Sequence, residues 1–183
     1  MATRSKRYAL AIDTEKCINC RACMVACRAE NGVPLRYNRN WVEAEIRGEY
    51  PKLVAVFEPG QCQQCEDPAC VRVCPTGASH RRADGIIAIN EADCVGCRYC
   101  ILACPYEARF FREDRGVVEK CNFCAQRVDR GESPACVETC PSHVRIFGDL
   151  NDPDSALRAV LDRRQQHTKK PEAGTNPQIF YLP

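Results

Sequence analysis

The sequence predicts an α+β protein of short antiparallel strands, short helices and loops, in which bound metal supplements a small hydrophobic core. Three observations lead to this prediction. The 183 residues include sixteen cysteines. These cysteines fall into four groups of four, with none left over. The apolar stretches between the groups are short and are separated by turn-forming residues. Metal can stabilise such a chain, because binding at a site absent from the unfolded state adds to the free energy of folding.

The four groups of cysteines have closely related spacings. Groups I and III are spaced C-x2-C-x2-C-x3-C, whereas the second gap has four residues in group II and eleven in group IV. Proline follows the last cysteine of groups II, III and IV, as Pro75, Pro105 and Pro141, and Arg28 takes this place in group I. In order, the groups are Cys17, Cys20, Cys23 and Cys27; Cys62, Cys65, Cys70 and Cys74; Cys94, Cys97, Cys100 and Cys104; and Cys121, Cys124, Cys136 and Cys140.

This spacing is that of the bacterial ferredoxin motif, which ligates [4Fe–4S] clusters. Three closely spaced thiolates can wrap three irons of one cubane, and the x3 step starts a helix that aims the fourth cysteine at a second cluster. The proline suits the first turn of that helix or the turn entering it. Small residues such as Gly96 fit a close approach of the backbone to the cluster. We therefore predict four [4Fe–4S] clusters as cofactors, with all sixteen cysteines as iron ligands.

Two other uses of cysteine fit less well. Structural zinc sites usually present two separated C-x2-C pairs, whereas groups I and III place three cysteines in one seven-residue loop. A disulfide framework is typical of much shorter secreted chains and does not explain quartets that end in Cys-Pro. Zinc remains the main rival to iron–sulfur clusters.

The four groups form an internal repeat, since two such motifs make one two-cluster ferredoxin unit. The 19 residues between groups II and III read as a turn, a hairpin around Asp84-Gly85 and a strand at residues 86–89. If groups II and III pair, residues 60–105 form a ferredoxin-like unit inserted into an outer unit made of residues 1–59 and 106–150. Spacing alone also allows group I to pair with II and group III with IV.

The remaining elements are expected in chain order. They are a strand at residues 8–13; a hairpin of residues 41–46 and 53–57 that turns at Arg47-Gly48; a second hairpin of residues 110–111 and 117–118; a strand at residues 144–147; and a helix at residues 154–164. Residues 151–183 form a C-terminal extension, whose polar tail from His167 is expected to run along a surface, such as that of a partner.

Charge and hydropathy exclude several classes. The formal charge is +2, with no basic run, which argues against nucleic-acid binding. Each oxidised site would add about −2, so four sites would bring the charge to about −6. The longest apolar stretches, such as residues 53–57, are too short to cross a membrane. No secretory signal is visible, which favours the cytoplasm unless a partner carries an export signal.

The remaining polar residues indicate no catalytic site. His80, His143 and His167 are expected at the surface or beside the clusters rather than as ligands, because the cysteines already fill the four sites. The pairs Arg81-Arg82 and Arg163-Arg164 are expected to be solvated rather than to dock a partner. No nucleophilic triad, phosphate loop or carboxylate pair is present. The chain is therefore not expected to be an enzyme by itself or to bind a small-molecule substrate directly.

The four groups, with a long gap only in group IV, resemble the four-cluster beta subunits of molybdopterin oxidoreductases, the dimethyl sulfoxide reductase family. The resemblance covers residues 8–150 and includes the stretches 11–13, 74–78, 104–106 and 147–150. The short length and the ending at residues 174–182 look most like polysulfide and thiosulfate reductase beta subunits. The resemblance implies an electron-transfer subunit of an oxidoreductase complex, active in anaerobic respiration. A free-standing soluble polyferredoxin is the alternative.

The resemblance also implies a nested ligand pairing. The implied clusters take Cys17, Cys20, Cys23 and Cys140; Cys121, Cys124, Cys136 and Cys27; Cys62, Cys65, Cys70 and Cys104; and Cys94, Cys97, Cys100 and Cys74. The first would lie near a molybdopterin-containing catalytic subunit and the fourth near a quinone-binding integral membrane subunit. In nitrate reductase relatives the position of Cys97 is not cysteine and the cluster is [3Fe–4S], so Cys97 implies [4Fe–4S] here.

Localisation follows only from the resemblance. Many complexes of this family are exported on a partner's twin-arginine signal. The chain is therefore expected to be peripheral at the cytoplasmic membrane, on its periplasmic face, with the cytoplasmic face as the alternative.

Overall fold

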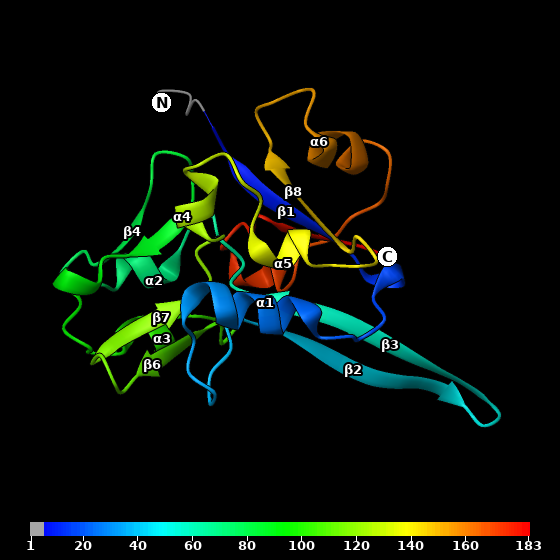
Figure 1. Ribbon diagram of the computed structural model, residues 1–183, viewed down its shortest axis with the longest axis horizontal. Coiled ribbons are helices and arrows are strands. Elements are labelled where there is room, and N and C mark those ends of the chain that lie inside the picture. Colours follow the sequence, from blue (N-terminus) through cyan, green and yellow to red (C-terminus); the bar gives the residue numbers. More distant parts are fainter. Residues whose placement is uncertain (1–5) are drawn as a thin grey trace.

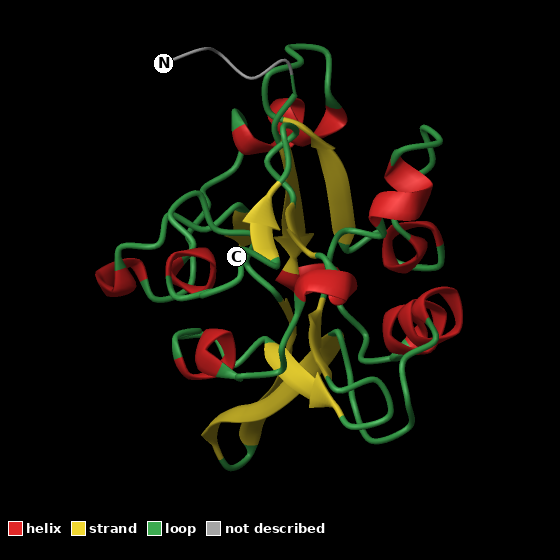
Figure 2. Cartoon of the chain, turned by 90° about the vertical axis from the view of Figure 1, so that its left-hand side faces the viewer, coloured by secondary structure: helices red, strands yellow, loops and turns green. Residues whose placement is uncertain are grey.

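The computed structural model describes residues 6–183 and has an α+β fold (Figure 1). The strands are β1 (Tyr8–Asp13), β2 (Asn40–Glu49), β3 (Lys52–Gln61), β4 (Ser79–Arg81), β5 (Ile87–Ile89), β6 (Arg109–Arg112), β7 (Val117–Lys120), β8 (Arg145–Asp149) and β9 (Ile179–Leu182). The α-helices are α1 (Ala22–Asn31), α2 (Ala69–Arg72), α3 (Tyr99–Leu102), α4 (Ala125–Val128), α5 (Ala135–Glu138) and α6 (Ala156–Leu161). Short 3₁₀ turns are η1 (Thr14–Lys16), η2 (Glu91–Asp93) and η3 (Pro171–Ala173). Figure 2 shows the helices around a central column of strands.

The central sheet has the order β8-β1-β9. Strand β1 buries both of its faces, and alternate side chains enter two different clusters of apolar residues. Leu10 and Ile12 belong to the larger cluster, which also contains several cysteines. Ala9 and Ala11 pack on the other face with Leu157 of α6. The sequence-predicted strand at residues 8–13 is confirmed, and it joins the cysteine-containing core to the α6 side.

The C-terminal tail is exposed from Lys170 to Gly174 but is buried near its end, so the expectation that it runs along a surface is wrong for its last residues. Strand β9 pairs in parallel with β1, and Ile179, Tyr181 and Leu182 are all 0% exposed. The cause is hydrophobic burial, because this short apolar run fills the free edge of β1 and closes the core. The polar composition between His167 and Gln178 gives no sign of this strand.

The hairpin β2–β3 forms an arm that projects from the rest of the chain (Figure 1). The hairpin is confirmed, but the turn expected at Arg47-Gly48 is wrong, because the strands continue to Glu49 and Lys52. Gly48 instead lies within β2 and pairs with Leu53. Its φ is +95°, and a Cβ there would lie 2.2 Å from the Lys52 carbonyl oxygen. Gly48 therefore correctly indicates an unusual backbone conformation, but it does not mark the position of the turn.

The other predicted elements are present with small shifts of their bounds. Antiparallel hairpins β4–β5 and β6–β7 lie where the sequence predicted hairpins. Strand β8 and helix α6 correspond to the predicted strand and helix near residues 144–147 and 154–164. That residues 60–105 form a unit inserted into a second one stays a prediction.

The prolines after the cysteine groups end helices rather than begin them, which corrects the expectation from the sequence. Helices α2, α3 and α5 each contain the third cysteine of a group and stop before its fourth cysteine. Pro75, Pro105 and Pro141 come next and restrict the preceding cysteine away from helical geometry. In group I, where Arg28 replaces proline, α1 continues to Asn31.

Candidate iron–sulfur centres

Four hollows in the protein are each lined by four cysteines. We call them pockets A to D. Pocket A is lined by Cys17, Cys20, Cys23 and Cys140; pocket B by Cys27, Cys121, Cys124 and Cys136; pocket C by Cys62, Cys65, Cys70 and Cys104; and pocket D by Cys74, Cys94, Cys97 and Cys100. Each pocket combines three cysteines of one group with one cysteine of another. That four cysteines line the same pocket is observed in the structure, whereas their ligation of the same cluster stays a prediction.

The four binding loops share a backbone feature that the spacing does not reveal. In every group the residue just before the second cysteine is left-handed: Asn19, Gln64, Gly96 and Phe123, with φ between 48° and 67°. For an L-residue other than glycine this costs roughly 1–2 kcal/mol. In the sequence Gly96 marks this position most clearly, and asparagine, as at Asn19, also adopts it more readily than most residues. A Cβ on Gly96 would lie 2.6 Å from the Gly116 carbonyl oxygen, so the glycine is also required by packing against the β6–β7 turn.

Several hydrogen-bond donors face the sulfur atoms. The Ser79 N–H donates to Cys74 Sγ at 3.4 Å, and the Val144 N–H donates to Cys140 Sγ at 3.3 Å. The Asn31 amide lies 3.6 Å from the sulfurs of both Cys27 and Cys124 in pocket B. Such donors stabilise negative charge on thiolate sulfur and help to set the potential of an iron–sulfur cluster.

Burial disfavours free thiolates at these sites. It raises the pKa of Cys65 to about 12, of Cys121 to about 12 and of Cys136 to about 11. At Cys74 burial also acts to raise the pKa, but hydrogen bonds from Ser79 and Thr76 outweigh it and lower the pKa. Metal coordination deprotonates a thiol outright, so iron would supply the positive charge that these buried sulfurs otherwise lack.

Buried donors without a protein partner provide a test of whether an iron–sulfur cluster fits. Arg109 Nη1 and Gln61 Nε2 are both buried and donate to no protein atom within the described part of the chain. Arg109 lines pockets C and D, and Gln61 lines pocket B. A buried donor needs an acceptor, and the sulfide corners of a cluster can supply one. Sixteen thiols, of which four line each hollow, together with spare donors at pockets B, C and D, therefore fit [4Fe–4S] clusters.

The histidines lie apart from these hollows. His80 Nδ1 lies 3.0 Å from the Ala78 carbonyl oxygen, and His143 and His167 are exposed. None of them is among the residues that line pockets A to D. Arg82 forms ion pairs with Asp84 and Asp129.

Sequence reasoning missed two buried arginines at the pockets. Arg109 donates to Cys70 Sγ at 2.8 Å, and Arg145 Nη2 lies 4.0 Å from Cys23 Sγ. A signal for both is present in the sequence, because each arginine follows the last cysteine of its group by five residues. Groups III and IV share this arginine, whereas groups I and II have Gly32 and Ser79 at the same offset.

Comparison with known proteins agrees with this geometry. Two models of the 4Fe-4S dicluster domain match residues 53–150 and 12–78. The B component of polysulfide reductase from Wolinella succinogenes is 42% identical, with 98% of this chain and 95% of the relative covered. The B component of tetrathionate reductase from Salmonella typhimurium is 41% identical, with 96% and 72% covered. The B component of sulfite dehydrogenase from Allochromatium vinosum is 37% identical, with 97% and 83% covered.

The fold and the four cysteine-lined pockets define an iron–sulfur protein of the electron-transfer class, not an enzyme on its own. The chain belongs to the family of iron–sulfur subunits built from 4Fe-4S dicluster domains, together with these three relatives. Within residues 6–183, no helix has the length and apolar character that crossing a bilayer requires.

Proposed function

We propose that the chain carries single electrons through four [4Fe–4S] clusters, one in each of pockets A to D, within a membrane-associated oxidoreductase complex. The observation that carries this proposal is that every cysteine lines one of four hollows and each hollow receives four cysteines. A [4Fe–4S] cluster changes charge by one electron, and its potential depends on net charge, hydrogen bonds to sulfur and exposure. The protein's part is to hold, separate and tune the clusters.

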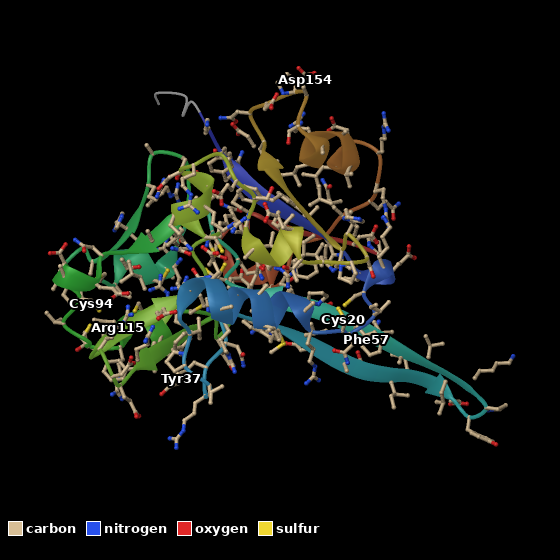
Figure 3. All side chains as sticks on the ribbon, viewed as in Figure 1. Cys20, Tyr37, Phe57, Cys94, Arg115 and Asp154 are labelled. Atoms are coloured by element: carbon tan, nitrogen blue, oxygen red, sulfur yellow. The ribbon has the colours of Figure 1, made fainter. Side chains whose placement is uncertain are left out.

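The ends of this series would lie at pockets A and D. Each of these two pockets contains one exposed cysteine, Cys20 in A and Cys97 in D, whereas pockets B and C contain none. Figure 3 shows Cys20 beside the base of the β2–β3 arm and Cys94, another cysteine of pocket D, at the opposite side of the molecule. This separation supports entry of electrons at one end and exit at the other.

We assign a molybdopterin-containing catalytic subunit to the pocket A end and a quinone-binding membrane subunit to the pocket D end. Support comes from the family, whose members include components of polysulfide reductase and of sulfite dehydrogenase. One of these names denotes a reduction and the other an oxidation, so the family fits either direction of flow. The complex would hold this chain at the membrane surface, on the periplasmic face.

The apolar side of the arm supports a protein partner at pocket A. Pairs across the hairpin place Val42 opposite Pro59, Ala44 opposite Phe57, Ile46 opposite Ala55, and Gly48 opposite Leu53, all on one face. The base of this face, Val42 and Pro59, lines pocket A itself. Further out, Ile46 is 73% exposed and Leu53 is 51% exposed. A continuous apolar strip that begins at a redox centre suits a permanent subunit interface.

Pocket D also has exposed apolar neighbours. Val95 and Tyr99 are 67% and 58% exposed, and Leu102 is 84% exposed. Val95 lines the pocket, and Tyr99 and Leu102 belong to the helix that carries Cys100. This second patch supports a second partner at the opposite end.

The test begins with the complex purified anaerobically. We expect about 16 iron and 16 acid-labile sulfide per chain, together with a catalytic and a membrane subunit. Zinc in place of iron would refute the proposal. Purification of a chain that is fully loaded but binds no other subunit would instead favour a free-standing polyferredoxin.

Cysteine pairing is tested by redox titration followed by electron paramagnetic resonance. Cys20→Ser and Cys140→Ser should affect the same cluster signal, because both residues line pocket A. Cys27→Ser should affect the signal altered by Cys124→Ser. If Cys27→Ser altered the signal that Cys62→Ser alters, groups I and II would pair and the nested arrangement would be wrong.

The role of the arm is tested by Ile46→Glu together with Leu53→Glu. We expect loss of the catalytic subunit from the purified complex, with iron content and membrane attachment unchanged. The matched control is Val54→Glu, which lies on the other face of the arm and is 61% exposed. Equal loss in the control would contradict a specific interface.

A further inference from the structure

Three buried cations, Arg109, Lys120 and Arg145, lie in the interior without a carboxylate partner. They are 5%, 3% and 3% exposed, and no ion pair joins them to an acidic side chain of residues 6–183. Buried Arg112 is different, because it pairs with Glu119 at 2.9 Å. An unpaired buried charge is expensive, so these three need a source of negative charge elsewhere.

Arg145 connects pockets A and B. Its side chain lines pocket A, where Nη2 lies 4.0 Å from Cys23 Sγ. Its Nη1 donates to Gln61 Oε1, and Gln61 lines pocket B. The guanidinium therefore lies at the junction of these two pockets.

Lys120 connects pockets B and C. Its Nζ donates to the Cys121 carbonyl oxygen at 2.8 Å, and Cys121 lines pocket B. The same Nζ donates to the Ile87 carbonyl oxygen, and Ile87 lines pocket C. Gln64 joins the same two residues without a charge, since it donates to the Cys121 carbonyl oxygen and accepts from the Ile87 N–H, both at 2.8 Å.

Arg109 connects pockets C and D, and its side chain lines both of them. Nη2 donates to Cys70 Sγ and to Ser79 Oγ, each at 2.8 Å, while Nη1 has no protein acceptor among residues 6–183. Cys70 lines pocket C and Ser79 lines pocket D. One cation thus lies at each of the three junctions in the series A, B, C and D.

The repeat relates two of these cations. Arg109 begins β6 and Arg145 begins β8, each five residues after the last cysteine of its group. Arg109 contacts the sulfur of Cys70, the third cysteine of group II, and Arg145 lies near the sulfur of Cys23, the third cysteine of group I. In each case the cysteine that precedes the arginine by five residues lines the same pocket as the contacted sulfur. Lys120 has no such counterpart, because it belongs to the single contact between pockets B and C.

We propose that Arg145, Lys120 and Arg109 are shared counter-charges, each of which raises the reduction potentials of the two clusters that flank it. This inference rests on the proposed function. A loaded, oxidised pocket carries about −2, and reduction adds one more negative charge. A fixed cation between two pockets stabilises the reduced form of both, and the low-dielectric interior screens this attraction little. Arginine keeps its charge in any such environment, so the geometry at Arg145 and Arg109 carries the proposal. At Lys120 burial lowers the pKa, and the negative charge of Cys62 and Cys121 opposes this shift.

The experiment is a potentiometric titration of the anaerobically purified complex, with each cluster followed by electron paramagnetic resonance. Lys120→Gln removes the charge and keeps an amide that can donate to the two carbonyl oxygens. We expect the potentials of the clusters in pockets B and C to fall, and those in A and D to stay unchanged. Lys120→Arg retains the charge and should restore both potentials.

Two controls separate charge from structure. Gln64→Leu removes neutral hydrogen bonds at the same junction and should leave the B and C potentials closer to wild type than Lys120→Gln does. Lys52→Gln, at the exposed start of β3, should shift no potential. If Lys120→Gln left both potentials unchanged, or if Lys120→Arg failed to restore them, the proposal for this junction would be overturned.

The other junctions keep the proposal testable if Lys120→Gln does not assemble. Arg145→Gln should lower the potentials in A and B, and Arg109→Gln those in C and D, with Arg145→Lys and Arg109→Lys as charge-retaining partners. A shift confined to one pocket, or spread over all four, would contradict a cation shared by two neighbours. Iron and sulfide analysis reports separately on the proposed function, because a wrong cluster count would appear there in the wild-type chain.

Discussion

Pockets B and D are each lined by four cysteines but differ in their access to solvent. The four cysteines of pocket B are between 4% and 7% exposed. In pocket D only Cys100 is buried, Cys74 and Cys94 are half-buried and Cys97 is exposed. Pocket B also has a buried ion-pair network at its wall, since Arg39 lines the pocket and pairs with Glu119. The comparison shows that similar cysteine groups can line both a buried pocket and an exposed one, and the proposed function assigns the exposed one to electron exchange.

The largest expected difference between pockets B and D is the effect of removing one cysteine. Cys124→Ser should prevent pocket B from being loaded and should greatly reduce the amount of folded protein. The reason is that the surrounding thiols and the nearby Arg145 would be buried without compensating charge. The measurement is the yield of soluble chain after anaerobic expression, with iron content per chain. Normal yield with only one cluster lost would show that pocket B is not essential to the fold.

The matching change in pocket D should be tolerated. Cys97→Ser removes an exposed ligand, so we expect normal yield, a [3Fe–4S] cluster in pocket D and a higher potential for that cluster. Electron paramagnetic resonance of the oxidised variant provides the measurement. Absence of a new [3Fe–4S] signal, with all other signals normal, would contradict the assignment of Cys97 as an iron ligand.

The ion pairs beside pockets B and D should also differ, with the buried pairs near pocket B contributing more to the free energy of unfolding. Glu119 is 5% exposed and pairs with Arg39 and Arg112, so Glu119→Gln leaves two buried cations with less compensation. We expect the free energy of unfolding to fall by about 3–5 kcal/mol. Denaturant unfolding of the loaded chain under anaerobic conditions measures this. A loss below about 1 kcal/mol, typical of exposed pairs, would mean that water screens the network.

The smallest effect is expected for the ion pair near pocket D. Glu91 and Arg115 are 48% and 50% exposed and lie 3.1 Å apart. Glu91→Gln should lower the free energy of unfolding by about 0.2–1 kcal/mol, and added salt should erase the difference. The same denaturant experiment at two salt concentrations measures it. A loss as large as that of Glu119→Gln would remove the distinction between the two regions.

The parts predictable from sequence are those set by local patterns. Fixed cysteine spacings identify the candidate ligands, and the alternating apolar residues of 8–13 identify β1. The wrong turn in the arm has a physical reason: Gly48 marks unusual backbone, but strand pairing continues past it to Glu49. Likewise, a proline acts on the cysteine before it as well as on the residues after it, so it can end one helix instead of starting the next.

The parts that were missed depend on contacts between distant residues. Strand β9 is short, and only its pairing with β1 and its burial distinguish it from a polar tail. Gln64 and Phe123 carry no sequence sign of a left-handed backbone, because the surrounding loop imposes it, whereas Asn19 is of a residue type that adopts it more readily. Arg109 and Arg145 share an offset of five residues from the last cysteine of their groups, but only the fold shows that they are buried between pockets. Local propensity cannot report such tertiary effects.

The pairing of β1 with β9 also has a consequence for the order of assembly. Leu10 lies opposite Ile179, so all sixteen cysteines lie in the chain between these two strands. During synthesis every thiol therefore becomes available before the strand that completes the central sheet has been made. Such a distant pairing forms slowly, because the long intervening chain must be ordered first. All sixteen thiols are therefore present while the central sheet is still open at its β9 edge.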